Sequence, residues 1–356
     1  MKRVIYFSLL ICVASAVIVG SLYAQSKKTG TAAATELLIP IGARDLAMGS
    51  ATTANTYGVE AIHFNPAGLG KMKYSAEGMF SKMNYIADIG VNYGAVGGSF
   101  GGFGNVALSV KSLSFGDIPL TTEDDPENFS GKFFSPAYVT IGLTYARALT
   151  DAISVGGSVK IISEKIERVS SNGLALDFGV MYNGLVGIQG LHLGVAVKNV
   201  GPQMKFDGTG LYRLAISTDG RRPEQRYKTD AASFELPSTV EIGLAYDRKW
   251  GDNMMLSLNG SFTNNNLYRD EYRMGGEISY GVESLTLFGR GGYSIVAEAQ
   301  DRTDIFGSSV KENIFGATVG GGITYVTSAV TITFDYAYRK VDLFDNNNVI
   351  SVKLGF

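Results

Sequence analysis

One arrangement in the sequence is typical of nucleophilic catalysis. Gly97-Gly98-Ser99-Phe100-Gly101 matches the G-x-S-x-G pattern, in which the serine stands on a sharp turn between a strand and a helix. Here the serine falls in a short turn between two predicted strands, so a chance match is the better account. The two histidines, His63 and His192, have no metal-ligand spacing, and the serine has no evident base. We therefore expect a protein that is not an enzyme, with no catalytic residues and no cofactor.

A run of acidic residues, Glu123-Asp124-Asp125-Pro126-Glu127, is the other group with chemical potential. Clustered carboxylates bind divalent cations when their spacing follows a calcium-loop pattern, which is not present here. A solvated loop is the preferred interpretation, and we expect no metal site.

The composition favours strands over helices. The chain has 45 Gly, 19 Tyr and 19 Phe but only 8 Pro and 1 Cys among 356 residues. Its net charge of -2 offers no basic surface for nucleic acid, so we expect no nucleic-acid partner.

The first residues resemble a Sec signal peptide. Lys2-Arg3 precede an apolar run over residues 4–19, and small residues follow up to Ala24. We expect residues 1–24 to be removed after export, with the exact cleavage site and the choice between cleavage and an uncleaved anchor left open. Cys12 lies within this run, so the mature chain is expected to contain no thiol.

From residue 74 onward, apolar and polar residues alternate with a period of two. Ile332, Phe334 and Tyr336, for example, alternate with Thr333 and Asp335. Strands are predicted at residues 75–83, 89–98, 103–114, 136–148, 152–166, 173–183, 191–200, 236–248, 253–263, 271–280, 285–294, 314–326, 330–340 and 347–356. The sequence thus predicts an all-β transmembrane barrel of about 14 antiparallel strands over residues 74–356. A secreted sandwich or solenoid is the alternative, but its strands are usually shorter.

The connectors alternate in length, as in outer-membrane barrels. Tight turns are predicted at residues 99–102, 149–151, 250–252, 281–283 and 327–329, with a longer one at 184–190, and these should face the periplasm. Long connectors at residues 115–135, 201–235 and 296–313, with shorter ones near Tyr85, Val169, Asn265 and Asp345, should face outward.

Eleven charged residues fall on the inner face of the predicted strands. They are Lys160, Asp177, Lys198, Glu241, Asp247, Arg273, Glu277, Arg290, Asp335, Arg339 and Lys353. They could line a solute path, or they could be ion pairs that hold the interior together, which is the preferred interpretation.

The last residues alternate to a terminal aromatic residue. Ile350, Val352, Leu354 and Phe356 point the same way, a pattern that resembles the insertion signal of outer-membrane barrels.

Two motifs precede the first predicted strand. The first contains Gly42, Ala43, Arg44, Asp45, Met48 and Gly49, and the second contains Asn65, Pro66, Ala67, Gly68 and Leu69. Their types and spacing resemble the GAR-x-x-x-MG-x-A and NPAGL motifs of the PorV/PorQ family, relatives of the FadL-type barrels. Residues 55–60 replace that family's acidic stretch, which leaves the subfamily open.

The second motif also has a direct physical interpretation. Asn65-Pro66 favours a turn, Gly68 permits a positive φ, and the small residues allow backbones to approach closely. We expect residues 25–73 to form an N-terminal plug folded back into the lumen, with any disorder limited to residues 25–35.

The resemblance implies an outer-membrane protein of a Gram-negative bacterium that works in type IX secretion. In that role the barrel sits in outer-membrane lipid and binds the C-terminal signal domains of secreted cargo, the translocon, or both. The alternative is a FadL-like channel that admits hydrophobic compounds across the outer membrane, and composition does not separate the two.

Overall fold

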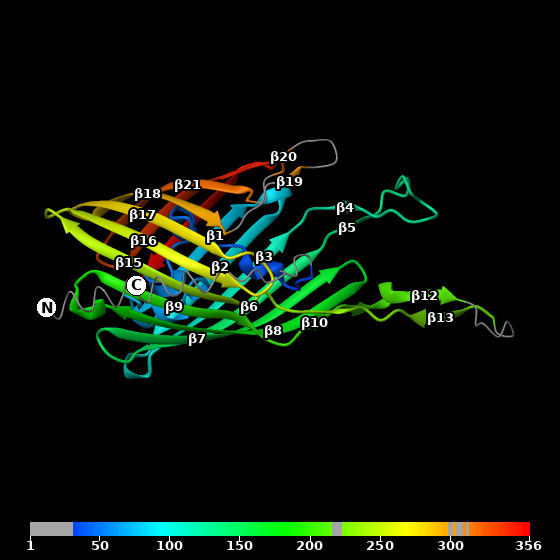
Figure 1. Ribbon diagram of the computed structural model, residues 1–356, viewed down its shortest axis with the longest axis horizontal. Coiled ribbons are helices and arrows are strands. Elements are labelled where there is room, and N and C mark those ends of the chain that lie inside the picture. Colours follow the sequence, from blue (N-terminus) through cyan, green and yellow to red (C-terminus); the bar gives the residue numbers. More distant parts are fainter. Residues whose placement is uncertain (1–30, 216–222, 298–301, 304–308, 311–312) are drawn as a thin grey trace.

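The computed structural model describes residues 31–215, 223–297, 302–303, 309–310 and 313–356 (Figure 1). The predicted signal peptide, residues 1–24, lies outside the described residues. Within the described part of the chain, no helix is long and apolar enough to cross a membrane.

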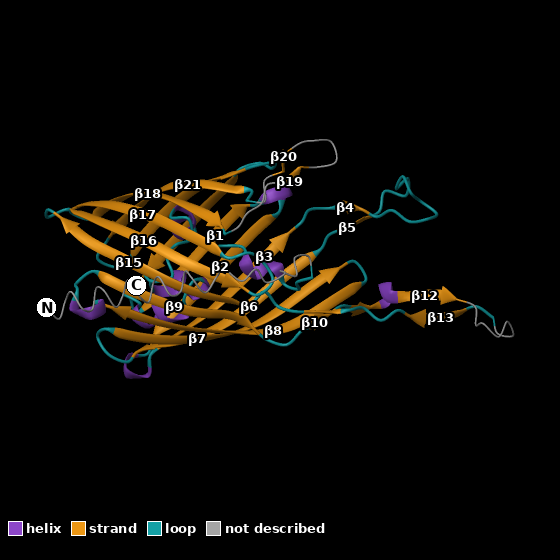
Figure 2. Ribbon diagram, in the orientation of Figure 1, coloured by secondary structure: helices purple, strands orange, loops and turns teal. Residues whose placement is uncertain are grey.

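Fourteen antiparallel strands close into one barrel (Figures 1 and 2). They are β1 (Ala76–Asn84), β2 (Gly90–Ser99), β3 (Asn105–Ser114), β6 (Ala137–Ala148), β7 (Ile153–Ile166), β8 (Val169–Asn183), β9 (Leu191–Val200), β15 (Thr239–Trp250), β16 (Met254–Asn265), β17 (Glu271–Val282), β18 (Leu285–Val296), β21 (Phe315–Val326), β22 (Thr331–Val341) and β23 (Asn347–Gly355). Each strand pairs with the next, and β23 pairs with β1 to complete the circle. The predicted barrel and its strand number are confirmed, and a sandwich, which has open edges, is excluded.

The alternation in the sequence decides which face of each strand is covered. In β22, Ile332, Phe334 and Tyr336 are exposed on the outer face, whereas Thr333 and Asp335 are buried inside. The barrel strands are 9 to 15 residues long, and a strand tilted across a bilayer needs about 9 to 11 residues. An apolar outer face around a polar interior is the arrangement that lipid requires of a barrel.

Strand β8 differs from the prediction because it begins at Val169, four residues before the predicted start. Glu167, with φ of 48°, turns the chain between β7 and β8, and Ser170 and Ser171 pair with Lys165 and Glu164. These polar residues interrupt the apolar alternation. They nevertheless pair, because backbone hydrogen bonds do not require apolar side chains at the rim of a barrel.

Short hairpins lie in the long connectors, which were predicted as loops without strands. They are β4 (Ile118–Pro119) with β5 (Phe133–Phe134), β10 (Met204–Lys205) with β14 (Ser233–Phe234), β12 (Tyr212–Ala215) with β13 (Gln225–Lys228), and β19 (Arg302–Thr303) with β20 (Ser309–Val310), while β11 (Asp207–Gly208) pairs with β8. Figure 2 shows the β4–β5 and β12–β13 hairpins extending far beyond one end of the barrel, here called the long-loop end. The opposite end, with the tight turns, is called the short-turn end.

The segment before β1 folds into short helical turns. They are η2 (Thr35–Leu38), α2 (Ala43–Ala47), η3 (Gly58–His63) and η4 (Pro66–Lys71); further single turns, η5 (Ile86–Asp88), η6 (Gly101–Phe103), η7 (Leu185–Gly187) and η8 (Thr209–Leu211), lie in connectors. Ile41, Val59 and Phe64 form a buried cluster with the inward-facing Met79 and Tyr93. Residues 31–73, hereafter the N-terminal segment, therefore pack against the inner face of the barrel wall.

The terminal strand closes the barrel. The Phe356 amide donates to the carbonyl of Ala76, and its carbonyl accepts from Ser75 at 2.9 Å. Ile350 and Phe356 are exposed on the outer surface, whereas Val352 and Leu354 are partly covered. The proposed insertion signal lies on the seam strand, and its role in insertion stays a prediction.

Candidate functional site: the N-terminal segment and the cavity beside it

Glycines on seven strands let the N-terminal segment touch the wall directly. A Cβ atom at Gly156 would lie 2.4 Å from the carbonyl oxygen of Pro66, and one at Gly275 would lie 2.2 Å from that of Met48. The set, called the glycine layer, is Gly156, Gly179, Gly194, Gly243, Gly275, Gly292 and Gly320. A Cβ atom would meet backbone atoms of the segment at Gly156, Gly194, Gly275 and Gly292, and side-chain atoms at the other three positions. Glycine is therefore required by the close approach of the segment to the wall.

The first motif forms α2 and the turn after it. Gly42 and Gly49 adopt φ of 76° and 65°, a region that favours glycine. Arg44 donates to both carboxylate oxygens of Glu277 on β17, at 3.2 and 3.3 Å. The buried Asp45 accepts a hydrogen bond of 2.6 Å from Thr56. The motif thus fixes α2 against the β17–β22 side of the wall.

Burial shifts the pKa values of two groups in the N-terminal segment, Asp45 and His63. Burial and the neighbouring Glu60 raise the pKa of Asp45 to about 7, against the opposing effect of Arg44. Burial and the cations Lys111 and Lys198 lower the pKa of His63 well below its ordinary value, so its imidazole is neutral at pH 7.

The second motif forms η4 on the opposite wall. Asn65 caps the helix by accepting from the Ala67 amide at 3.1 Å, and Pro66 occupies the first turn. The amide nitrogen of Asn65 donates to the carbonyls of Thr53 and Val180, at 3.0 and 3.2 Å. This side chain therefore ties η4 to another part of the segment and to β8.

Gly68 has a different role from the predicted one. It does not adopt a positive φ, but a Cβ atom there would lie 2.2 Å from the carbonyl oxygen of Thr56. The requirement is space and not backbone conformation. The two motifs do not meet, because η4 packs on β6 and β7 whereas α2 packs on β21 and β22.

Ion pairs fill most of the interior, as the preferred interpretation of the lumen charges predicted. Lys160 lies 2.8 Å from Asp177, Lys198 lies 2.8 Å from Glu241, and Lys353 reaches Glu60 of the N-terminal segment at 3.0 Å. Arg290 binds both Glu277 and Asp335, and Asp247 lies 3.4 Å from His192. Among the described residues, Arg339 alone of the eleven has no oppositely ionisable group at ion-pair distance.

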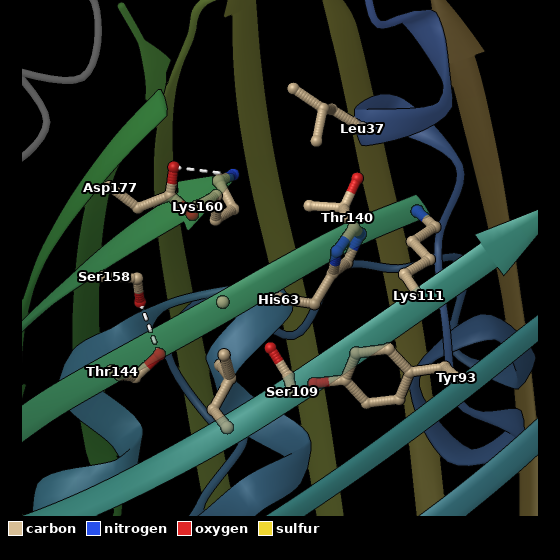
Figure 3. Close-up of a pocket in the computed structure, with 12 residues that line it drawn as sticks. Leu37, His63, Tyr93, Ser109, Lys111, Thr140, Thr144, Ser158, Lys160 and Asp177 are labelled. Atoms are coloured by element: carbon tan, nitrogen blue, oxygen red, sulfur yellow. Dashed lines mark hydrogen bonds and ion pairs between the residues drawn. The ribbon is translucent and has the colours of Figure 1, made fainter. Parts of the chain in front are cut away.

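A narrow polar crevice lies between the segment and strands β2, β3 and β6–β8. Figure 3 shows the side chains of His63, Tyr93, Lys111 and Thr140 converging on it. Its volume is about 40 Å³, and within the described chain the buried hydroxyl of Thr140 has no hydrogen-bond partner. A polar space of this size suits a water molecule or two and is too small for an organic ligand.

A much larger cavity of about 580 Å³ lies on the long-loop side of the N-terminal segment. Residues 35–40 and the side chains of His63 and Phe64 line its floor. Its walls carry aromatic residues near the strand ends: Tyr85, Phe115, Tyr138, Tyr268 and Phe315. They also carry charged residues: Lys198, Glu241, Arg269, Glu271, Arg273 and Arg339. Known ligand pockets have volumes of about 300 to 1,000 Å³, so this cavity can enclose a small organic molecule.

Glu36 is the titratable group at the edge of this floor. Its side chain is 2% exposed, and neither carboxyl oxygen has a hydrogen-bond partner among the described residues. Burial, and then the nearby Glu164 of β7, raise the pKa of Glu36 to about 8, although Lys111 opposes the shift. Glu36 is therefore largely protonated at neutral pH, which makes the η2 region sensitive to alkaline conditions.

The other candidate residues from the sequence make contacts that indicate structural roles. Ser99 ends β2 beside the short turn η6, without the strand-to-helix elbow of a hydrolase. His63 packs edge-to-face on Phe64, with ring centroids 5.1 Å apart. Asp125 accepts from the amides of Phe129 and Ser130 in its own loop. In the described part of the chain, no group of three His, Cys, Asp or Glu residues could hold a metal ion.

Several residues of the cavity were not predicted from the sequence. Tyr85, Phe115 and Phe315 stand in connectors or at strand ends, where aromatic residues carry no periodic signal. Glu36 lies in a segment without regular alternation. Tyr85 and Phe115 lie just beyond predicted strands and Phe315 lies near the start of one, so aromatic residues at strand ends were the available indication.

The fold is shared with solved channel structures. The CymD monoaromatic hydrocarbon channel matches with a TM-score of 0.59 and 14% identity over 89% of this chain and 97% of that chain. The toluene transporter TodX of Pseudomonas putida matches with a TM-score of 0.53 and 12% identity over 88% and 98%. A Pseudomonas aeruginosa FadL homologue matches with a TM-score of 0.51 and 11% identity over 89% and 98%.

No family model matches the sequence, and no curated protein matches it. At identities of 11 to 14% the agreement concerns the fold. The chain therefore has the closed barrel architecture found in these hydrocarbon channels and in the FadL homologue.

Proposed function

We propose that this protein is a non-enzymatic channel that admits small hydrophobic compounds across the outer membrane of a Gram-negative bacterium. The observation that carries the proposal is the cavity of about 580 Å³, which lies inside a closed barrel and ends on the N-terminal segment. Its walls expose more apolar than polar surface, which suits a compound with a hydrophobic body.

The membrane location is part of the same proposal. The exposed apolar band around the strands requires lipid, and closed barrels of this kind occur in outer membranes. The N-terminal segment acts as the plug, because it packs directly against the glycine layer on seven strands. The solved structures of the same fold are named as hydrocarbon channels and toluene transporters, which supports the choice of solute class.

Uptake of a labelled solute tests the proposal. Gram-negative cells that lack such a channel should accumulate radiolabelled toluene faster when they produce this protein. Thr239→Trp should reduce uptake to the rate of cells without the protein, because Thr239 is buried and lines the cavity.

The matched control is the adjacent residue on the lipid face. Val240→Trp places the same bulk on the outer surface, where Val240 is 42% exposed, and should leave uptake unchanged. Heat-modifiable migration in gels must show that both variants are folded. Equal uptake by folded Thr239→Trp and wild type would contradict a route through this cavity.

A second candidate is a role in type IX secretion, as implied by the PorV/PorQ resemblance. The observation that favours it is the length of the hairpins at the long-loop end, which present exposed apolar residues. Phe129 is 90% exposed, and Leu214 is 61% exposed on β12. Exposed aromatic and apolar groups beside charges are typical of surfaces that bind other proteins.

One pair of variants separates the two candidates. Deleting residues 212–228 removes the β12–β13 hairpin but keeps β10, β11 and β14, so the barrel should still fold. Loss of cargo-domain or translocon binding with normal toluene uptake would favour secretion. Loss of uptake in an Asn65→Ala, Gly68→Val variant, with partner binding retained by the shortened protein, would favour the channel.

A further inference from the structure

Arg339 has an unusual environment for a buried cation. It lies on the inner face of β22, lines the large cavity and is 7% exposed. Its guanidinium carbon lies 3.9 Å from the ring centroid of Phe315 and 5.8 Å from that of Tyr85. When the Asn347 amide is turned so that its oxygen faces the guanidinium, which is the orientation that satisfies both groups, this oxygen accepts from Nε and Nη2 at 3.2 and 2.6 Å.

None of these contacts supplies a negative charge. Phe315 attracts the cation through its ring face, the Tyr85 side chain is also a hydrogen-bond partner, and Asn347 is a neutral acceptor that uses two of the five N–H donors. Glu271 attracts Arg339 only from beyond ion-pair distance. The acidic residues of the cavity wall are already bound, Glu271 by Arg273 at 2.7 Å and Glu241 by Lys198 at 2.8 Å. Among the described residues, no carboxylate reaches Arg339 at ion-pair distance.

A buried charge without a counter-charge is unfavourable, and proteins keep such groups where a ligand supplies the missing charge. A guanidinium is a planar fork that matches a carboxylate with two parallel hydrogen bonds. Because Arg339 carries one positive charge, a ligand with one negative charge would neutralise it. A monoanion is therefore favoured over a phosphate ester, which carries up to two negative charges.

The aromatic residues of the cavity wall indicate which kind of ligand body fits there. The ring centroids of Tyr85 and Phe315 lie 6.1 Å apart beside Arg339. The rings of Phe115 and Tyr138 form an edge-to-face pair, with centroids 4.8 Å apart. Flat aromatic groups pack favourably against such rings. Within the described residues, the cavity thus combines aromatic rings with one guanidinium, that of Arg339, which has no carboxylate at ion-pair distance.

We propose that Arg339 binds the carboxylate of a compact aromatic carboxylate, with the aromatic body against Tyr85 and Phe315. The inference rests on the proposed channel function and adds the solute class: a benzoate-like anion in addition to neutral hydrocarbons. Arg339 holds the anion, and the aromatic residues hold the ring.

Calorimetric titration of the full-length protein in detergent tests this assignment, with benzoate, toluene and decanoate as probes. Wild type should bind benzoate more tightly than decanoate. Arg339→Gln should weaken benzoate binding at least about tenfold, the loss expected for a charge-assisted bidentate contact, and should weaken binding of the uncharged toluene by a clearly smaller factor. Arg248→Gln is the control, because Arg248 is exposed near the short-turn end.

A second variant tests the same assignment even if the Arg339→Gln protein does not fold. Asn347→Asp places a carboxylate where the amide already accepts from Arg339, so the cation gains an internal partner. This variant should be at least as stable as wild type, yet it should also lose benzoate affinity and keep toluene affinity. A purely structural Arg339 would leave benzoate binding unaffected by Asn347→Asp.

The results distinguish this inference from the proposed channel. Toluene binding without benzoate binding in wild type would overturn the aromatic-carboxylate site and leave the channel standing. Tighter binding of decanoate than benzoate would overturn the aromatic body. Absence of binding and uptake for every probe would overturn the channel itself.

Discussion

Asn65 makes four side-chain hydrogen bonds, the longest of them a 3.5 Å contact with the carbonyl of Val195. Its side chain is buried, accepts from the Ala67 amide and donates to the carbonyls of Thr53 and Val180. Asn65→Ala would leave these backbone groups without partners in a dry interior, which should destabilise the protein by about 1–3 kcal/mol. Thermal unfolding in detergent measures the change.

The control for this substitution is Asn253→Ala in an exposed tight turn, where only the backbone carbonyl of Asn253 is used, by Gly281. It should unfold at the wild-type temperature. Equal melting temperatures for Asn65→Ala and Asn253→Ala would contradict a clamping role for Asn65.

Glu36 should make the start of the N-terminal segment pH-dependent. Its pKa is about 8 in the folded protein and 4.5 when it is released, so the folded state holds the extra proton. The stabilisation is complete below pH 4.5 and is lost as pH rises through 8. The other ionisable groups near Glu36 are Glu164, Tyr138 and Lys111. The Lys111 ammonium donates to the carbonyls of Glu36 and Ile39.

Hydrogen exchange measures this effect. Protection of the amides of Ala33, Leu37 and Ile39, corrected for intrinsic rates, should fall about tenfold or more between pH 6 and 9, because one pKa unit corresponds to about 1.4 kcal/mol. Glu36→Gln should hold the low-pH protection throughout. A pH-independent wild type would show that Glu36 is ionised in the folded state.

At the scale of the elements, adjacent glycines of β7 provide a matched pair of substitutions. Gly156 faces inward, where a Cβ atom would lie 2.8 Å from the Ala67 amide nitrogen, whereas the nearest atom to one at Gly157 is 3.5 Å away. Gly156→Ala should destabilise the protein by about 1–3 kcal/mol through overpacking, and Gly157→Ala should be nearly neutral. Protease digestion of the segment and thermal unfolding both report the difference, and equal behaviour of the two variants would contradict direct contact at the glycine layer.

The strands were predictable from the sequence because each must present one face to lipid and the other to a polar interior. Ile332, Phe334 and Tyr336 follow that rule without exception. The start of β8 and the β12–β13 hairpin were not predicted, because they lie beyond the lipid and have polar sequences. The need for glycine at positions 156 and 179 was not predictable, because it comes from Pro66 and Asn65, about 90 and 114 residues away along the chain.

The charges of the candidate site were only partly predictable. Period-two alternation placed Lys160, Asp177 and Arg339 on the inner face. It did not reveal which of them lacks a counter-charge, because partners lie on different strands or in the N-terminal segment, as for Lys353 and Glu60.

At the scale of the whole molecule, the unequal ends predict an orientation. The long-loop end should face the outside of the cell, so a cysteine at Asp124, beside Asp125, should react with a membrane-impermeant maleimide in intact cells. One at Asp252, beside Gly251, should react only after lysis. Positions 124 and 252 are both exposed. Labels near Arg222 and Asp304, in the other two long connectors, should also react in intact cells, and both positions lie outside the described residues.

The mature chain should contain no other thiol, because the only cysteine, Cys12, lies in the predicted leader. Reaction at position 252 and protection at position 124 in intact cells would mean that the barrel is inserted in the opposite direction.

The glycine layer also bears on the order in which the molecule is assembled. The N-terminal segment directly precedes β1, and the ring closes only when β1 pairs with β23, for example Glu77 with Gly355. A chain that fits against seven strands without room for a methyl group cannot thread into a finished barrel. We therefore expect the segment to pack on the open, curving sheet before the last seam forms, so that its contacts with the seven strands set the circumference at which β1 meets β23.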